Sequence, residues 1–121
     1  MDNPIKECGD APHCVSTKSS SPKRTIQPII FNGAKSEFKQ IAMAVIESMP
    51  RSKIVTADDN YIHAEFTSSM MKFVDDFELY FDENKKMIDL RSSARVGYYD
   101  FGVNLKRSKE FEIEFLKKTK K

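Results

Sequence analysis

The stretch of residues 75–95 reads DDFELYFDENKKMIDLRSSAR, and its alternating pattern decides the fold. The apolar residues of its first half are Phe77, Leu79 and Phe81, each separated from the next by one residue. That period of two is typical of a strand with one buried face, and residues 87–95 repeat it. The intervening residues 83–85 form a turn that is too short for a parallel crossover. The two runs therefore must pair antiparallel.

A hairpin closed at residues 83–86 sets the register between these two strands. In this register three pairs lie opposite each other: Asp76 and Ser93, Glu78 and Arg91, and Tyr80 and Asp89. Arg95 then lies diagonal to Asp76. The result is a polar sheet face that carries charges of both signs.

The same patterns extend toward the N-terminus. Residues 61–67 alternate cleanly, with Tyr61, His63 and Glu65 on the polar side, where we expect His63 to be a plain surface histidine. Residues 52–56 form a brief strand. Between residues 34 and 49, apolar residues recur at spacings of three and four, which predicts an amphipathic helix that Pro50 ends. Residues 24–31 (RTIQPIIF) favour a strand, at an edge or with a bulge because of Pro28.

The last segment, residues 105–121, fits two structures. Phe111, Ile113 and Phe115 alternate with glutamates, as in a strand, but Phe111 and Phe115 are also four apart, as in a helix. Asn104 suits a helix N-cap and the terminal lysines suit a helix C-terminus, so we favour a helix. The predicted fold is α+β: a curved five-stranded antiparallel sheet with two helices packed on one face, in the order β-α-β-β-β-β-α.

Length and charge exclude several classes of protein. The 121 residues support one domain, and the net charge of +2 does not by itself imply nucleic acid or an anionic membrane as a partner. No apolar run reaches the roughly 20 residues of a transmembrane helix. The N-terminus has no apolar leader, which predicts a cytoplasmic protein, or one of the cell envelope or periplasm if the chain lacks its native leader.

Residues 1–23 are polar and proline-rich, and we interpret them as an N-terminal arm that precedes a single domain of residues 24–121. The arm holds Cys8 and Cys14, which would form a disulfide in an oxidising compartment and stay free thiols in the cytosol. A zinc site with Asp10 and His13 is disfavoured, because the spacing is not that of a zinc knuckle and no second Cys/His pair completes it. We predict no metal site and no cofactor.

Three motifs resemble one known family. They are CVST at residues 14–17, Phe73-Val-Asp75-Asp76, and the block from Arg91 to Asn104. In the block, the residues that match the family pattern are Arg91, Ser92, Arg95, Gly97, Asp100, Gly102 and Asn104, with Ala94 in place of the usual serine. The chain resembles the bacterial and plant family called domain of unknown function 1499, from about Cys8 to the last helix. This resemblance implies no particular activity.

The charged residues of the hairpin and the following loop are the candidate ligand-binding site. They are Asp75, Asp76, Glu78, Arg91, Arg95, Asp100, Asn104 and Arg107. Guanidinium forks beside carboxylates suit a small anionic or zwitterionic ligand or a protein partner, although a solvated face with cross-strand ion pairs has the same composition. Gly97 and Gly102 bracket Asp100 in a loop, where Asp100 could fix the loop or cap the helix.

We therefore expect a small binding or interaction module that is not catalytic. The alternative is a small hydrolase or isomerase that uses Asp76 or Asp100 as the base and Arg91 or Arg95 as the electrostatic stabiliser. An enzyme would hold a carboxylate of raised pKa in a pocket, whereas a binding module would present an open face.

Overall fold

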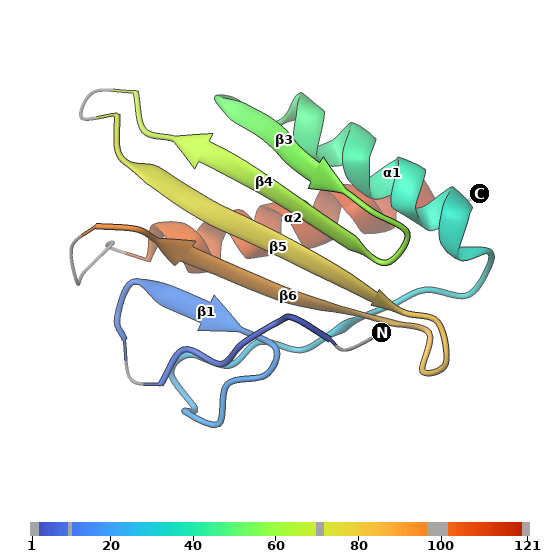
Figure 1. Cartoon of the computed structure of the whole chain (residues 1–121), viewed down its shortest axis with the longest axis horizontal. Coiled ribbons are helices and arrows are strands. Elements are labelled where there is room, and N and C mark those ends of the chain that lie inside the picture. The colour runs from blue at the N-terminus through green and yellow to red at the C-terminus, as the bar shows by residue number, and fades with distance from the viewer. Residues whose placement is uncertain (1–2, 10, 70–71, 97–101, 120–121) are drawn as a thin grey trace.

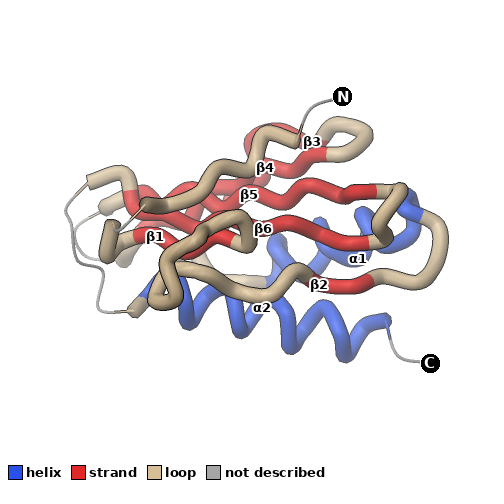
Figure 2. The backbone as a smooth tube through the Cα atoms, turned by 90° about the horizontal axis from the view of Figure 1, so that it is seen from below, coloured by secondary structure: helices blue, strands red, loops and turns tan. Residues whose placement is uncertain are grey.

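The computed structural model describes residues 3–9, 11–69, 72–96 and 102–119. The elements run in the order β1 (Cys14–Ser16), β2 (Ile29–Ile30), α1 (Lys35–Ser48), β3 (Ser52–Ala57), β4 (Tyr61–Thr67), β5 (Val74–Asp82), β6 (Met87–Ala94) and α2 (Val103–Thr119). The strands form one antiparallel sheet, and both helices lie on the same face of it (Figures 1 and 2). The predicted α+β fold is confirmed.

The number of strands differs from the prediction of five. The sheet order is β1-β6-β5-β4-β3, and β2 also pairs with β6, which makes six strands within the described residues. Strand β1 pairs with residues 91–93 of β6 and β2 with residues 87–88, so the two short strands share one edge of β6. The strand expected at residues 24–31 is reduced to β2, which begins directly after Pro28, a residue without an N–H for the ladder.

Strand β1 comes from the segment that we interpreted as an arm, and the sequence analysis did not predict it. All three of its residues are buried, and it continues the sheet beyond β6. Its brevity explains the miss, because three residues show no periodicity. The division of the chain at residue 23 stays a prediction.

The core lies between the sheet and the two helices and is rich in phenylalanine. The ring of Phe77 on β5 lies 5.3 Å from that of Phe111 on α2, and the ring of Phe38 on α1 lies 6.1 Å from that of Phe115. These four rings are at most 6% exposed. Burial of such rings, at about 1.5–3 kcal/mol or more each, holds α1 and α2 on this face of the sheet.

Both helices follow the predicted pattern. The buried residues of α1 are Phe38, Ala42, Val45 and Ile46, and those of α2 are Asn104, Ser108, Phe111 and Phe115. The segment of α2 is a helix and not a strand. Phe111 and Phe115, which are four residues apart, are both buried, whereas Ile113, which would face the same side in a strand, is 53% exposed. Helix α2 begins at Val103, so Asn104 lies inside the helix and not at the N-cap position. Within the described residues, neither helix is long and apolar enough to cross a lipid bilayer.

Candidate functional site

The face of the sheet opposite the helices carries three rows of polar side chains that run across β4, β5 and β6. The predicted register of the hairpin is confirmed: Asp76 pairs with Ser93, Glu78 with Arg91 and Tyr80 with Asp89. On the other side of β5, the register places β4 residues against β5 residues in the pairs Tyr61 and Tyr80, His63 and Glu78, and Glu65 and Asp76. Strand alternation sets all of these side chains on one face.

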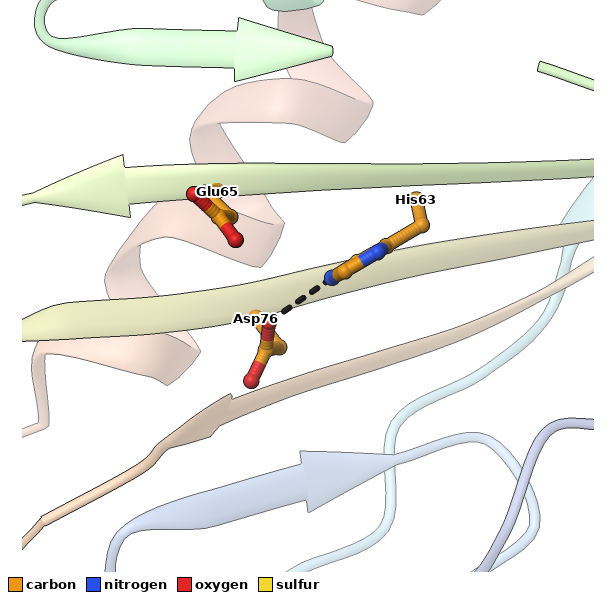
Figure 3. A group of neighbouring side chains, drawn as sticks. All are labelled: His63, Glu65 and Asp76. Atoms are coloured by element: carbon orange, nitrogen blue, oxygen red, sulfur yellow. Dashed lines mark hydrogen bonds and ion pairs between the residues drawn. The ribbon is translucent and has the colours of Figure 1, made fainter. Parts of the chain in front are cut away.

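Arg95, directly after β6, binds two carboxylates from two different strands. Its Nε and one terminal nitrogen donate to Asp76, both at 2.8 Å, and that terminal nitrogen also lies 2.6 Å from Glu65. Asp76 further accepts a hydrogen bond of 2.7 Å from Nε2 of His63 (Figure 3). The hydrogen bonds from Arg95, and then that from His63, hold the pKa of Asp76 below its usual range although burial opposes them.

The neighbouring row, which contains Glu78 and Arg91, is more loosely paired. The hydroxyl of Tyr61 donates to Glu78 at 2.7 Å, whereas Arg91 lies 3.6 Å from the other oxygen of Glu78. Burial, and then the bond to Glu78, raises the pKa of Tyr61. Among the described residues, Nε of Arg91 is a buried nitrogen without a hydrogen-bond partner. Arg91 therefore has donor capacity that the protein does not use.

The N-terminal segment closes one end of this face. Asp89 is 3% exposed, because Asn3 and Thr17 each donate to it at 2.8 Å and Lys18 lies 3.4 Å away. A disulfide joins Cys8 to Cys14, whose backbone pairs with Ser93. Asp89 is thus on the predicted face but buried there.

Three of the candidate residues lie on the other face, toward the helices. One terminal nitrogen of Arg107 donates to Asp75 at 2.8 Å and to Oδ1 of Asn104 at 3.0 Å. Asn104, fully buried, also accepts from Ser92 at 2.5 Å and donates to the carbonyl of His13 at 3.2 Å. These bonds tie α2 to β5, to β6 and to His13, which directly precedes β1.

A cavity of about 430 Å³ lies beside the Asp75–Arg107 pair. Its walls include the apolar side chains of Phe66, Phe73, Val96 and Val103. Three of these are exposed by 43–64%, and the guanidinium of Arg107 lies 4.6 Å from the centre of the Phe66 ring. An apolar pocket with one charged pair is a common form of ligand site.

The candidate loop is only partly described. Asp100 and Gly97 lie outside the described residues. Gly102 has a φ of 77°, in the left-handed region that favours glycine, and it directly precedes α2. The structure thus separates the candidates into Asp76, Glu78, Arg91 and Arg95 on the open face, and Asp75, Asn104 and Arg107 on the helix side.

A family model described as "Protein of unknown function (DUF1499)" matches residues 4–115. The chain belongs to this family. Within this DUF1499 domain, the block quoted above spans both faces of the sheet, since Arg91 and Arg95 lie on the open face and Ser92 bonds to Asn104 on the helix side. A search of the curated proteins finds no match for the chain.

The contribution of β4 to the site was not predicted from the sequence. His63 is not a plain surface histidine, because it bonds to Asp76, and Glu65 bonds to Arg95. Alternation in residues 61–67 placed both on the polar side, but nothing local fixes the register between β4 and β5. Ligand atoms of His63, Glu65 and Asp76 all lie within 4.8 Å of one another, a group that no sequence spacing indicated (Figure 3).

Proposed function

We propose that this protein is a small, non-catalytic binding module whose ligand contacts the open face of the sheet. We call this surface the charged face; it consists of Lys53, Tyr61, His63, Glu65, Asp76, Glu78, Arg91 and Arg95. The observation that carries the proposal is the arrangement of these side chains on neighbouring strands, with α1 and α2 both on the opposite face of the sheet (Figure 2). A sheet with fixed register holds such groups in place before a ligand arrives, which lowers the entropy cost of binding.

The charges of this face favour a zwitterionic ligand, or a protein surface with both signs, over a simple anion. Three carboxylates stand against three cations, so the formal charge of the face is zero with His63 neutral. The fork of Arg95 is already occupied by two carboxylates, whereas Arg91 has only a loose ion pair. Arg91 is therefore the group that would receive the carboxylate of a ligand, and Glu78 beside it would receive a positive group.

The alternative of a hydrolase or isomerase has less support. A general base works best with a pKa near the working pH, but Arg95 and His63 lower the pKa of Asp76. A carboxylate of lowered pKa accepts protons poorly and instead suits the binding of a positive group. Asp100, the other candidate base, lies outside the described residues.

The test is a thermal-shift screen of amino acids, betaines, polyamines and dicarboxylates, run in the presence of EDTA. We expect zwitterions to raise the melting temperature of the wild type and to lose at least about tenfold in affinity in Arg91→Gln, since one lost charged contact is worth about 1.5–3 kcal/mol. Lys109→Gln, which removes an equal charge from the exposed side of α2, is the matched control. Equal losses in both variants, or no hit in the wild type, would contradict the proposal.

A second candidate site is the cavity beside Asp75 and Arg107, and its exposed apolar walls favour it. It would take the apolar part of an amphipathic ligand. Phe73→Ser, at a wall residue that is 48% exposed, separates the two sites. A ligand that loses affinity in Phe73→Ser but not in Arg91→Gln binds in the cavity, and the reverse pattern places it on the charged face.

A further inference from the structure

We infer that His63, Glu65 and Asp76 form a binding site for a first-row divalent metal ion such as Zn²⁺, and that Arg95 competes with the metal for this site. The inference rests on the proposed use of the charged face for binding. It deepens that proposal by naming one ligand class and requires no organic ligand. The ligand set is one imidazole nitrogen and two carboxylate oxygens, which together suit Zn²⁺ and its neighbours in the first row.

The distances between the ligand atoms need little change for coordination. Nε2 of His63 lies 2.7 Å from Oδ1 of Asp76, and all three ligand atoms lie within 4.8 Å of one another. Two ligands of a tetrahedral zinc ion, each about 2.1 Å from the metal, are roughly 3.4 Å apart. Side-chain rotation alone can move Nε2 of His63 and Oδ1 of Asp76 apart from 2.7 Å to roughly 3.4 Å.

The backbone holds the three ligands on one rigid surface. Glu65 and Asp76 are direct partners in the β4–β5 register, and His63 lies two residues before Glu65 on the same face of β4 (Figure 3). Their side chains are 22–27% exposed, so solvent reaches the group. Three protein ligands and an accessible fourth position are the arrangement in which a bound water or a ligand atom completes the coordination.

The charge around the group explains why Arg95 is a competitor. Its guanidinium donates to both carboxylates and so occupies the place of the cation. Arg95 is 45% exposed in its side chain and follows the last residue of β6, so it can turn into solvent when a doubly charged ion arrives. Lys53, opposite Glu65 on the edge strand β3, adds a further positive charge that weakens metal binding.

The histidine must change tautomer when the metal binds. Because an ionised carboxylate only accepts hydrogen bonds, the 2.7 Å contact between Nε2 and Asp76 assigns a proton to Nε2. A metal on Nε2 requires that proton to leave this nitrogen, and the neutral ring then carries its proton on Nδ1. This change is visible in the ¹⁵N spectrum of His63 and would not occur if zinc bound elsewhere on the chain.

The test is calorimetric titration of the oxidised full chain with ZnCl₂, with ¹⁵N spectra of the histidine ring. We expect one zinc ion per chain, a tautomer change at His63, and at least about a tenfold loss of affinity in His63→Ala and in the isosteric Glu65→Gln. Arg95→Gln should bind zinc at least about tenfold more tightly than the wild type. Glu114→Gln, an exposed carboxylate of α2 in an ion pair with Lys117, is the control and should leave affinity unchanged.

The outcomes separate this inference from the proposed function. Zinc binding that His63→Ala leaves unchanged would overturn the inference, as would the absence of zinc binding in both the wild type and Arg95→Gln. Arg95→Gln is the variant that keeps the test decisive, because a structural role of Arg95 would lower affinity and the proposed competition raises it. Hits in the EDTA-containing ligand screen without zinc binding would overturn this inference alone. Zinc binding without any such hit would support it and contradict the zwitterion proposal.

Discussion

Asp75 and Asp76 are neighbours in the chain but have different roles. Because side chains alternate along a strand, Asp75 points to the helix side, where Arg107 of α2 binds it, and Asp76 points to the charged face, where Arg95 and His63 bind it. The sequence placed both in a single candidate site. Alternation alone could have separated them, since Asp75 is out of phase with Asp76 and Glu78.

At the residue scale, we predict that Arg95→Gln raises the pKa of Asp76 toward the ordinary value of about 3.9, because the bonds from Arg95 are the main cause of its depression. A lowered pKa in the folded state contributes stability above the unfolded pKa, and this contribution is lost as the pH falls through the folded pKa. The variant should therefore lose less stability than the wild type when the pH is lowered from about 5 to about 2. Carboxyl ¹³C titration measures the pKa directly. Arg91→Gln is the control, and an equal rise of the pKa in that variant would contradict the assignment.

At the scale of the element, α2 shows how two periodicities in one segment are resolved. Phe111 is fully buried and its ring lies 5.3 Å from Phe77 and 5.7 Å from Phe115, whereas Ile113 points outward. Phe111 and Phe115 pack into the core together, because residues four apart lie on the same face of a helix and form one continuous surface against the sheet. A local signal could not decide this, since both patterns are present in the same residues.

We accordingly predict different costs for two truncations in α2. Phe111→Ala should lower the free energy of unfolding by about 3–5 kcal/mol, the range for a buried phenylalanine, because it leaves a cavity against β5. Ile113→Ala should change it by less than about 0.5 kcal/mol, since the side chain is 53% exposed. Urea denaturation of both variants provides the comparison. Similar losses for the two would indicate that this segment is not the helix described.

At the scale of the whole molecule, the two faces of the sheet carry different kinds of side chain. The helix side carries the phenylalanine core and the buried network of Asn104, and the opposite side carries partly exposed charges. The net charge of +2 conceals this, because Asp76 and Glu78 pair with Arg95 and Arg91 across the sheet, and Asp75 pairs with Arg107 of α2. Substitutions on the charged face should therefore alter binding more than folding.

The disulfide belongs to this scale because it constrains the N-terminal segment that joins the sheet edge. Cys8 and Cys14 are six residues apart, and closing a loop of this length lowers the entropy of the unfolded chain by an amount worth about 2 kcal/mol. We predict that Cys8→Ser lowers the free energy of unfolding by about that amount. Mass spectrometry before and after reduction, applied to protein from its native compartment, should show a gain of two hydrogens. An unchanged mass on reduction would mean that the thiols are free there.

The sequence by itself determined the central strands, α1 and the contacts between close neighbours in the chain. Periods of two and of three to four residues indicated the central strands and α1, and the short turn before Met87 fixed the hairpin register, including the approach of Arg95 to Asp76. Only the tertiary structure decided the pairing of β1 with β6 and the position of His63 and Glu65 beside Asp76. The physical reason is that a two-strand register follows from its turn only when the turn is short. Contacts between distant segments depend instead on how the whole core packs.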